Sequence, residues 1–261
     1  MTIKYTGIKF IGKSWNCTLV AIPLFILLTM SGACKKNKLY DVTPAVIQPI
    51  NLLDDGVALR VNLSGQHPAR FSTLLTLANK SSLKRNIFVT SFPQRIDLYS
   101  QPDTMPHDRP VISTDLQLET GKSYSMFIYG EKTTASYSLQ EDQFPVIRWN
   151  DTLTYIRFAN FSENQAISVN LKGQAPGSYI QALPFKSITS FSAMRITLPL
   201  VNLEFEVRDQ VSGNLLSTYS VPKISTDLLH MWVNKPSTFV FTGHASGTGT
   251  NQQKLVLMMH R

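Results

Sequence analysis

The chain has 261 residues, among them 25 Lys and Arg, 17 Asp and Glu, and a formal net charge of +8. Three lysines precede residue 34 and three follow it directly, so residues 39–261 carry only +2. A nucleic-acid-binding domain concentrates its basic residues on one face, whereas the one short basic cluster here, Lys80, Lys84 and Arg85, is typical of a solvated hairpin. We therefore expect no nucleic-acid partner.

The N-terminal residues have the order of a secretory signal. Such a signal has a basic start, an apolar centre of about 7–15 residues and small residues before the cleavage site. Here three lysines precede an apolar run over residues 19–30, and Ser31-Gly32-Ala33 precedes Cys34. The run is too short for a membrane-spanning helix, which needs about 20 apolar residues. Ser31-Gly32-Ala33-Cys34 resembles the lipobox of bacterial lipoproteins, with Ser31 where that family usually has Leu.

The resemblance implies that residues 1–33 are a removed signal peptide and that Cys34 carries diacylglycerol and palmitate. The anchor would be the outer membrane of a Gram-negative bacterium, with its periplasmic or surface face undecided. The alternatives are an ordinary signal peptide with an incidental cysteine, or a short membrane anchor. Because Cys17 and Cys34 are the only cysteines, the mature chain would have no free thiol, disulfide or cysteine-bound metal.

The remainder of the chain predicts β-structure. Residues 34–56 are interpreted as a lipidated tether stiffened by two prolines, residues 57–147 as one Ig-like or β-sandwich domain, and residues 148–261 as a second. Short alternating runs broken by Gly, Pro, Asn and Asp favour such domains. Strands are expected at residues 58–63, 72–78, 86–90, 95–99, 123–129, 154–159, 166–171, 203–208, 215–221, 238–242 and 254–260.

Two details support this organisation. Along residues 203–208 apolar and charged side chains alternate, as in a half-buried strand, and residues 209–214 (Asp-Gln-Val-Ser-Gly-Asn) predict a hairpin turn. A weak internal repeat matches residues 76–81 with 157–162 and residues 124–130 with 238–243. On this alignment the second copy would contain an insertion of roughly 30 residues near residues 173–199.

A family resemblance extends over much of the second half. The stretches Tyr155-Ile156-Arg157-Phe158-Ala159-Asn160-Phe161-Ser162 and Ile167-Ser168-Val169-Asn170-Leu171, then residues 203–209, resemble successive strands of the β-sandwich family catalogued as domain of unknown function 4397. Residues 121–130 and, loosely, 237–249 resemble a further segment of it. Glu163-Asn164 and Asn170-Leu171 depart from its usual residues. The resemblance implies a fold and an envelope location, and no activity.

Patterns that carry catalysis are missing from the sequence. The five histidines include no H-x-H or H-E-x-x-H spacing for zinc, and Gly243-His244-Ala245-Ser246-Gly247 lacks the first glycine of a nucleophile elbow. The carboxylate pairs Glu141-Asp142 and Asp54-Asp55 fall in turn-like segments and are interpreted as solvated. We expect no catalytic residue, cofactor or metal, and no enzyme.

Four residues besides Cys34 are candidate sites. Thr104 and Thr152 lie in Asp-Thr-Met and Asp-Thr-Leu sequences, which resemble a three-residue O-glycosylation acceptor of some Gram-negative envelopes. Trp149 and Trp232 are the only tryptophans after the signal. Each could stack on a sugar, or pack in a core or between domains.

The sequence thus predicts a non-enzymatic, outer-membrane-anchored lipoprotein with an interaction or structural role. One alternative is a glycan-binding surface lipoprotein that works with an outer-membrane uptake system. Another is an adhesin-type subunit, which would need an open edge strand for a second chain.

Overall fold

Strands dominate the computed structural model, which describes residues 43–67, 69–83, 86–101, 103, 105, 108–148, 153–163, 165–196, 203–221 and 235–260. All of these residues belong to one compact unit. Two 3-10 turns, Phe71–Thr73 and Gly249–Asn251, are the only helical segments among them. The expected all-β class is confirmed. Across the described residues, no helix has the length and apolar character needed to cross a membrane.

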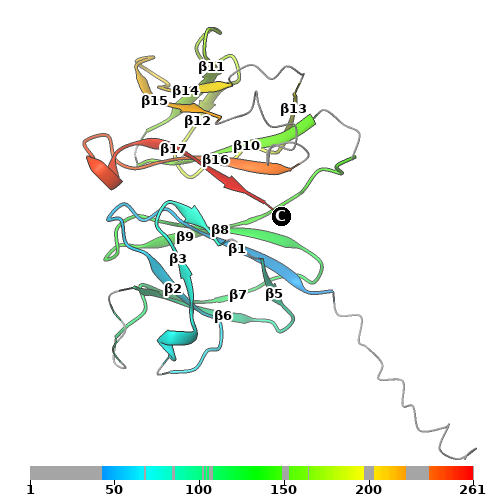
Figure 1. Ribbon diagram of the computed structural model, residues 1–261, viewed down its shortest axis with the longest axis vertical. Coiled ribbons are helices and arrows are strands. Elements are labelled where there is room, and N and C mark those ends of the chain that lie inside the picture. The colour runs from blue at the N-terminus through cyan, green and yellow to red at the C-terminus, as the bar shows by residue number, and fades with distance from the viewer. Residues whose placement is uncertain are drawn as a thin grey trace, which may run out of the picture. The chain divides into compact units, whose positions relative to one another are not determined.

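The first part of the chain forms two facing sheets, here called the first sheet pair (Figure 1). One sheet has the order β4-β1-β8-β9, with β5 also on β1, and the other has the order β3-β2-β6-β7. A hydrophobic core that includes Ile47, Leu59, Leu98 and Met126 fills the space between them, as in a β-sandwich. The strands are β1 (Ala45–Asn51), β2 (Leu59–Asn62), β3 (Leu75–Leu77), β4 (Ser81–Ser82), β5 (Ile87–Val89), β6 (Gln94–Ser100), β7 (Ile112–Leu116), β8 (Ser123–Tyr129) and β9 (Ser136–Glu141).

The rest of the chain forms a second sheet pair. Its sheets have the orders β13-β10-β16-β17 and β12-β11-β14-β15, and they enclose a separate core that includes Phe158, Val169, Phe205 and Phe239. This core contains several aromatic rings, with Phe158 and Phe239 stacked at 5.2 Å between ring centroids. The strands are β10 (Leu153–Phe161), β11 (Ile167–Leu171), β12 (Ile180–Leu183), β13 (Ser192–Arg195), β14 (Glu204–Asp209), β15 (Leu215–Ser220), β16 (Pro236–Thr242) and β17 (Lys254–Met259).

Both sheet pairs have the same topology. In each, the first strand pairs in parallel with the last but one: β1 with β8, and β10 with β16. The sheet orders then correspond strand by strand, with β1, β2, β3, β6, β7, β8 and β9 matching β10, β11, β12, β14, β15, β16 and β17. The internal repeat therefore exists at the level of strand topology.

Of the two segment matches in the predicted internal repeat, one is confirmed and the other is wrong. Residues 124–130 and 238–243 do correspond, because they belong to β8 and β16. Residues 76–81 and 157–162 do not, since the former span β3 and β4 and the latter lie at β10, whose counterpart is β1. Nor is there a large insertion: Ser123 lies 77 residues after its partner Val46, and Ser237 lies 81 residues after its partner Ile156.

Part of the segment interpreted as a tether is a strand. Residues 45–51 form β1, a buried central strand, so the first sheet pair begins well before residue 57. The sequence did not predict this strand because it contains Pro49, and proline removes a hydrogen-bond donor and is usually kept out of central strands. Strands β4, β7, β9, β12 and β13 were missed as well. The predicted turn after β14 is confirmed: Gly213 has a φ of 73° and its N–H donates to the Asp209 carbonyl at 2.9 Å.

Candidate functional site

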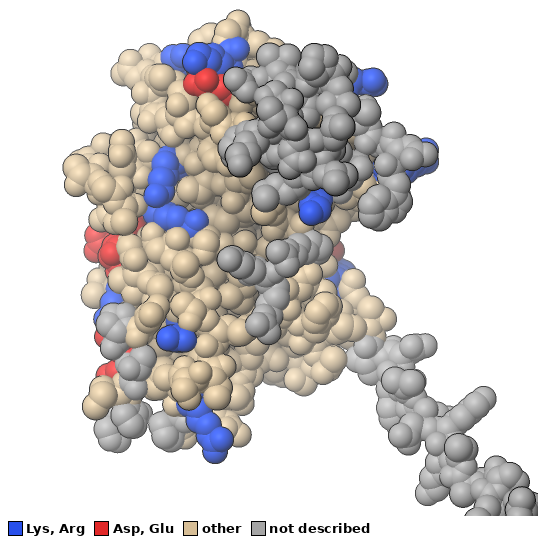
Figure 2. All heavy atoms as spheres, viewed as in Figure 1, with Lys and Arg blue, Asp and Glu red and all other residues tan. Residues whose placement is uncertain are grey.

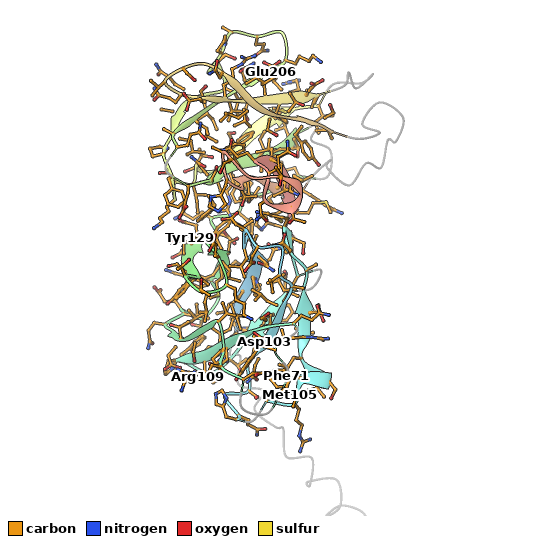
Figure 3. All side chains as sticks on the ribbon, turned by 90° about the vertical axis from the view of Figure 1, so that its left-hand side faces the viewer. Phe71, Asp103, Met105, Arg109, Tyr129 and Glu206 are labelled. Carbon is orange, nitrogen blue, oxygen red and sulfur yellow. The ribbon has the colours of Figure 1, made fainter. Side chains whose placement is uncertain are left out.

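The two sheet pairs meet through the sheets that contain β1, β8 and β9 on one side and β10, β16 and β17 on the other. We call this contact the junction. Ile50, Leu52, Phe127 and Tyr129 of the first pair form one buried cluster with Ala159, Phe161, Val240 and Met258 of the second. The rings of Phe127 and Phe161 stack at 4.8 Å. Figure 3 labels Tyr129 at mid-height, far from Glu206 at one end and Phe71 at the other.

Arg157 organises the polar part of the junction. Its side chain is 3% exposed, and its Nη2 lies 2.7 Å from Asp142 Oδ1 in the first sheet pair. Nη2 also donates to Ser125 Oγ at 3.0 Å, while Nε donates to Thr238 Oγ1 at 2.8 Å. The Ser125 hydroxyl in turn donates to Asp142 Oδ2 at 2.7 Å. Burial raises the pKa of Asp142, and Arg157 opposes that shift because it favours the carboxylate.

His260 extends this network. Its Nε2 lies 2.6 Å from Thr238 Oγ1, and the residue is 2% exposed. Since the Thr238 oxygen accepts from Arg157 Nε, we assign the hydroxyl proton to the bond with His260 Nε2, which is then the unprotonated ring nitrogen. Burial, and secondarily the charge of Arg157, lowers the pKa of His260 to about 3. His260 is therefore neutral at physiological pH.

Part of this hydrogen-bond network is repeated at equivalent positions of the two sheet pairs. The register of the parallel pairs places Gln48 beside Ser125 and Arg157 beside Thr238, so Gln48 and Arg157 are equivalent. The hydrogen bond from Ser125 to Asp142 likewise corresponds to that between Thr238 and His260. Gln48 crosses the junction as Arg157 does, since its Nε2 donates to the Met259 carbonyl at 2.9 Å. The ion pair between Arg157 and Asp142 has no charged equivalent, because Gln48 corresponds to Arg157 and the neutral His260 corresponds to Asp142.

A second polar cluster lies elsewhere in the junction. Lys80 Nζ is 3.1 Å from Asp54 Oδ1 and 3.1 Å from Thr242 Oγ1 of the second sheet pair. His244 Nε2 lies 3.2 Å from Asp54 Oδ2. Burial lowers the pKa of Lys80, and Asp54 partly offsets that shift. The expectation of a solvated Lys80 and Asp54 is wrong, because their side chains are only 6% and 5% exposed.

Lys186 is the counterpart of Lys80 in the second sheet pair. These are the only described non-glycine residues with positive φ, 52° for Lys80 and 64° for Lys186. Both follow the third strand of their pair by the same spacing, in Leu77-x-x-Lys80-Ser81 and Leu183-x-x-Lys186-Ser187. Lys186 Nζ lies 5.1 Å from the ring centre of Tyr129 across the junction. A left-handed lysine thus reaches the opposite sheet pair in both copies.

A third polar cluster lies within the first sheet pair. The fully buried Asp97 contacts Arg95 Nε at 3.2 Å and His67 Nε2 at 3.2 Å, and accepts from the Ser113 hydroxyl. Tyr99 Oη lies 3.0 Å from His67 Nδ1. His67 is half exposed, and none of these residues lines the cavities described next. The cluster therefore fixes strand β6 against its neighbours.

Two cavities flank the Arg157 network. The larger, of about 410 Å³, is lined by Gln140, Glu141, Gln143, Arg157, Ile188, Thr189, Ser190 and Phe191. The smaller, of about 120 Å³, is lined by Val46, Gln48, Asn86, Ser123, Tyr124, Asp142, Phe144 and His260. A third, of about 300 Å³, lies between β2 and the segment before β3. Within the described ranges, no three His, Cys, Asp or Glu side chains are grouped to hold a metal ion.

The sequence did not reveal this arrangement. Asp142 is buried at 7% exposure and Glu141 is the last residue of strand β9, so the interpretation of Glu141-Asp142 as a solvated turn is wrong. The family resemblance did include Arg157 and Asn160, but only as members of a strand pattern. Cys34, Thr104, Trp149, Thr152 and Trp232, the candidate sites of the sequence, all lie outside the described residues. Lipidation, glycosylation and sugar stacking at those positions stay predictions.

The surface charge is dispersed where it can be seen. On the face in Figure 2, Lys and Arg form small separate groups over the described residues.

No protein-family model matches the chain, and no curated protein matches it either. The resemblance to the domain of unknown function 4397 therefore stays an expectation.

Proposed function

We propose that this chain is a lipid-anchored envelope protein with a binding or structural role rather than a catalytic one. One observation carries the proposal. The side chains of Arg157, Asp142 and His260 are all more than nine-tenths buried, and Arg157 joins the two sheet pairs through Asp142 and Ser125. The two charged groups are therefore engaged with each other, whereas a catalytic acid or base must be able to exchange a proton with a substrate.

The anchor rests on Cys34 and its flanking residues. Stable membrane attachment by lipid needs more than one acyl chain, at roughly 0.8 kcal/mol for each buried CH₂. A thioether diacylglycerol on Cys34 supplies two chains. The folded residues then stand at the membrane of a Gram-negative envelope, joined to it by the chain after Cys34.

Cell fractionation and protease treatment test this proposal. We expect the wild-type chain in the outer-membrane fraction and the Cys34→Ser variant in the soluble fraction. Digestion of the wild type on intact cells would place the folded residues outside, and protection until the outer membrane is opened would place them in the periplasm. Equal membrane association of wild type and variant would overturn the lipid anchor.

A further inference from the structure

The larger junction cavity has the size of a small-molecule site. Binding pockets for such ligands measure roughly 300–1,000 Å³, and this cavity measures about 410 Å³. Its lining comes from β9 and Gln143 after it, from the segment before β13, and from Arg157 of β10. Because β9 is the edge strand of its sheet, the cavity lies where the two sheet pairs meet at an edge.

Several polar groups of this cavity are unused. The Gln143 side-chain amide and the Ser190 hydroxyl form no hydrogen bond with any residue that the structure describes, and both residues are exposed. Arg157 Nη1 is also unbonded within the same ranges, whereas Nε and Nη2 are fully engaged. An amide and a hydroxyl can each donate and accept, and Nη1 can donate twice. The cavity therefore offers both kinds of hydrogen bond to a ligand.

The charges that line the cavity are already compensated. Arg157 is paired with Asp142, and Glu141 Oε2 lies 2.9 Å from Lys122 Nζ. An ionic ligand would gain no unpaired counter-charge there. Phe191 supplies an aromatic wall, with the Arg157 guanidinium 4.4 Å from its ring centre. Hydroxyl, amide and aromatic groups without net charge suit a ligand that is neutral, rich in hydroxyls and partly apolar.

We propose that this cavity binds a neutral saccharide, with Gln143 and Ser190 donating to and accepting from its hydroxyl groups and Arg157 Nη1 donating from the floor. The proposal rests on the binding role proposed above and names its ligand class. It is independent of the lipid anchor, which the Cys34→Ser experiment tests separately. A negative result in one experiment therefore leaves the other interpretable.

The test measures sugar binding by the full-length protein in detergent. The probes are maltoheptaose, xylohexaose and mannohexaose as neutral oligosaccharides, and oligogalacturonate as the acidic one. Saturation-transfer NMR detects binding and calorimetry gives the Kd. The variants are Gln143→Ala and Ser190→Ala, with Gln181→Ala as a matched control because Gln181 is an exposed amide on β12 without a described hydrogen bond.

We expect at least one neutral oligosaccharide to bind and each cavity variant to weaken it by about tenfold, as the loss of one hydrogen bond implies. Gln181→Ala should leave the Kd unchanged. Thermal unfolding should match wild type in all three variants, since none of these side chains is buried. Binding by none of the neutral probes, binding by oligogalacturonate alone, or equal Kd values for Gln143→Ala and Gln181→Ala would each overturn the proposal.

Discussion

Asp142 and Arg157 form an ion pair whose carboxylate comes from the first sheet pair and whose guanidinium comes from the second, with Oδ1 and Nη2 2.7 Å apart. Both side chains are at most 3% exposed. Ser125 and Thr238 satisfy further polar atoms of the pair from each side. The junction is thus more than an apolar contact, because this ion pair and the hydrogen bond from Arg157 to Ser125 both cross it.

Removal of Arg157 should therefore destabilise the protein strongly. Arg157→Met leaves the Asp142 carboxyl buried without its counter-charge, and breaking such a pair costs about 3–5 kcal/mol. Urea unfolding measures the loss. Lys172→Met is the matched control, because Lys172 is 62% exposed in its pair with Glu204 and an exposed pair contributes about 0–1 kcal/mol. Similar losses in both variants would contradict the buried role of Arg157.

His260 should give the protein a pH-dependent stability. Its pKa is about 3 in the folded chain and about 6.5 for an ordinary histidine, so the unfolded chain takes up a proton at a higher pH. The contribution is complete above pH 6.5 and is lost as the pH falls toward 3, with a slope of at most about 1.4 kcal/mol per pH unit. His260→Gln should flatten this slope in urea unfolding between pH 4 and pH 7. Gln181→Ala, at an exposed position, should keep it; an unchanged slope in His260→Gln would refute the assignment.

Asn51 and Asn160 should contribute equally to stability, because they occupy equivalent positions. Asn51 Nδ2 donates to the Val57 and Leu77 carbonyls, and Asn160 Nδ2 donates to the Gln165 and Leu183 carbonyls. Both asparagines are fully buried.

Replacement by alanine leaves those carbonyls without donors, at about 1–3 kcal/mol for each unsatisfied group. We expect Asn51→Ala and Asn160→Ala to lower the free energy of unfolding by similar amounts. Asn214→Ala, at an exposed turn position, should change it by less than about 0.5 kcal/mol. A large loss in only one of the two buried variants would argue against equivalent roles.

Asp209 should stabilise the β14–β15 hairpin only while it is ionised. Hydrogen bonds from Gln165 Nε2 and from the Ser212 and Val211 backbone lower its pKa to about 2. A carboxyl with a lowered pKa stabilises the fold above its ordinary pKa and loses that effect as the pH falls through the folded value. The Tm should therefore fall between pH 4 and pH 2, and less so in Asp209→Asn. Equal falls in both proteins would contradict this role.

The sequence predicted strands where alternation is regular and failed where tertiary contacts decide. Residues 203–208 alternate clearly and form β14 as expected, and the strands expected at residues 238–242 and 254–260 are β16 and β17. β1 was missed because Pro49 interrupts an otherwise suitable run, and its place between β8 and β5 depends on residues far along the chain.

The junction could not be predicted for the same reason. Asp142 resembles any acidic residue at a strand end until β10 brings Arg157 against it. Lys80 looks solvated beside its charged neighbours, yet its positive φ directs the ammonium to Thr242, 162 residues later. One local signal was available: the spacing of Leu77, Lys80 and Ser81 recurs in Leu183, Lys186 and Ser187 and would have given the correct alignment of the repeat.

The lipid anchor is tested most directly by mass spectrometry of the N-terminal peptide of the protein purified from envelope membranes. We expect a mature chain that begins at Cys34, with a diacylglyceryl thioether on its sulfur and an acyl group on its amine. A chain that begins at another residue, or a Cys34 that carries a free thiol, would contradict it.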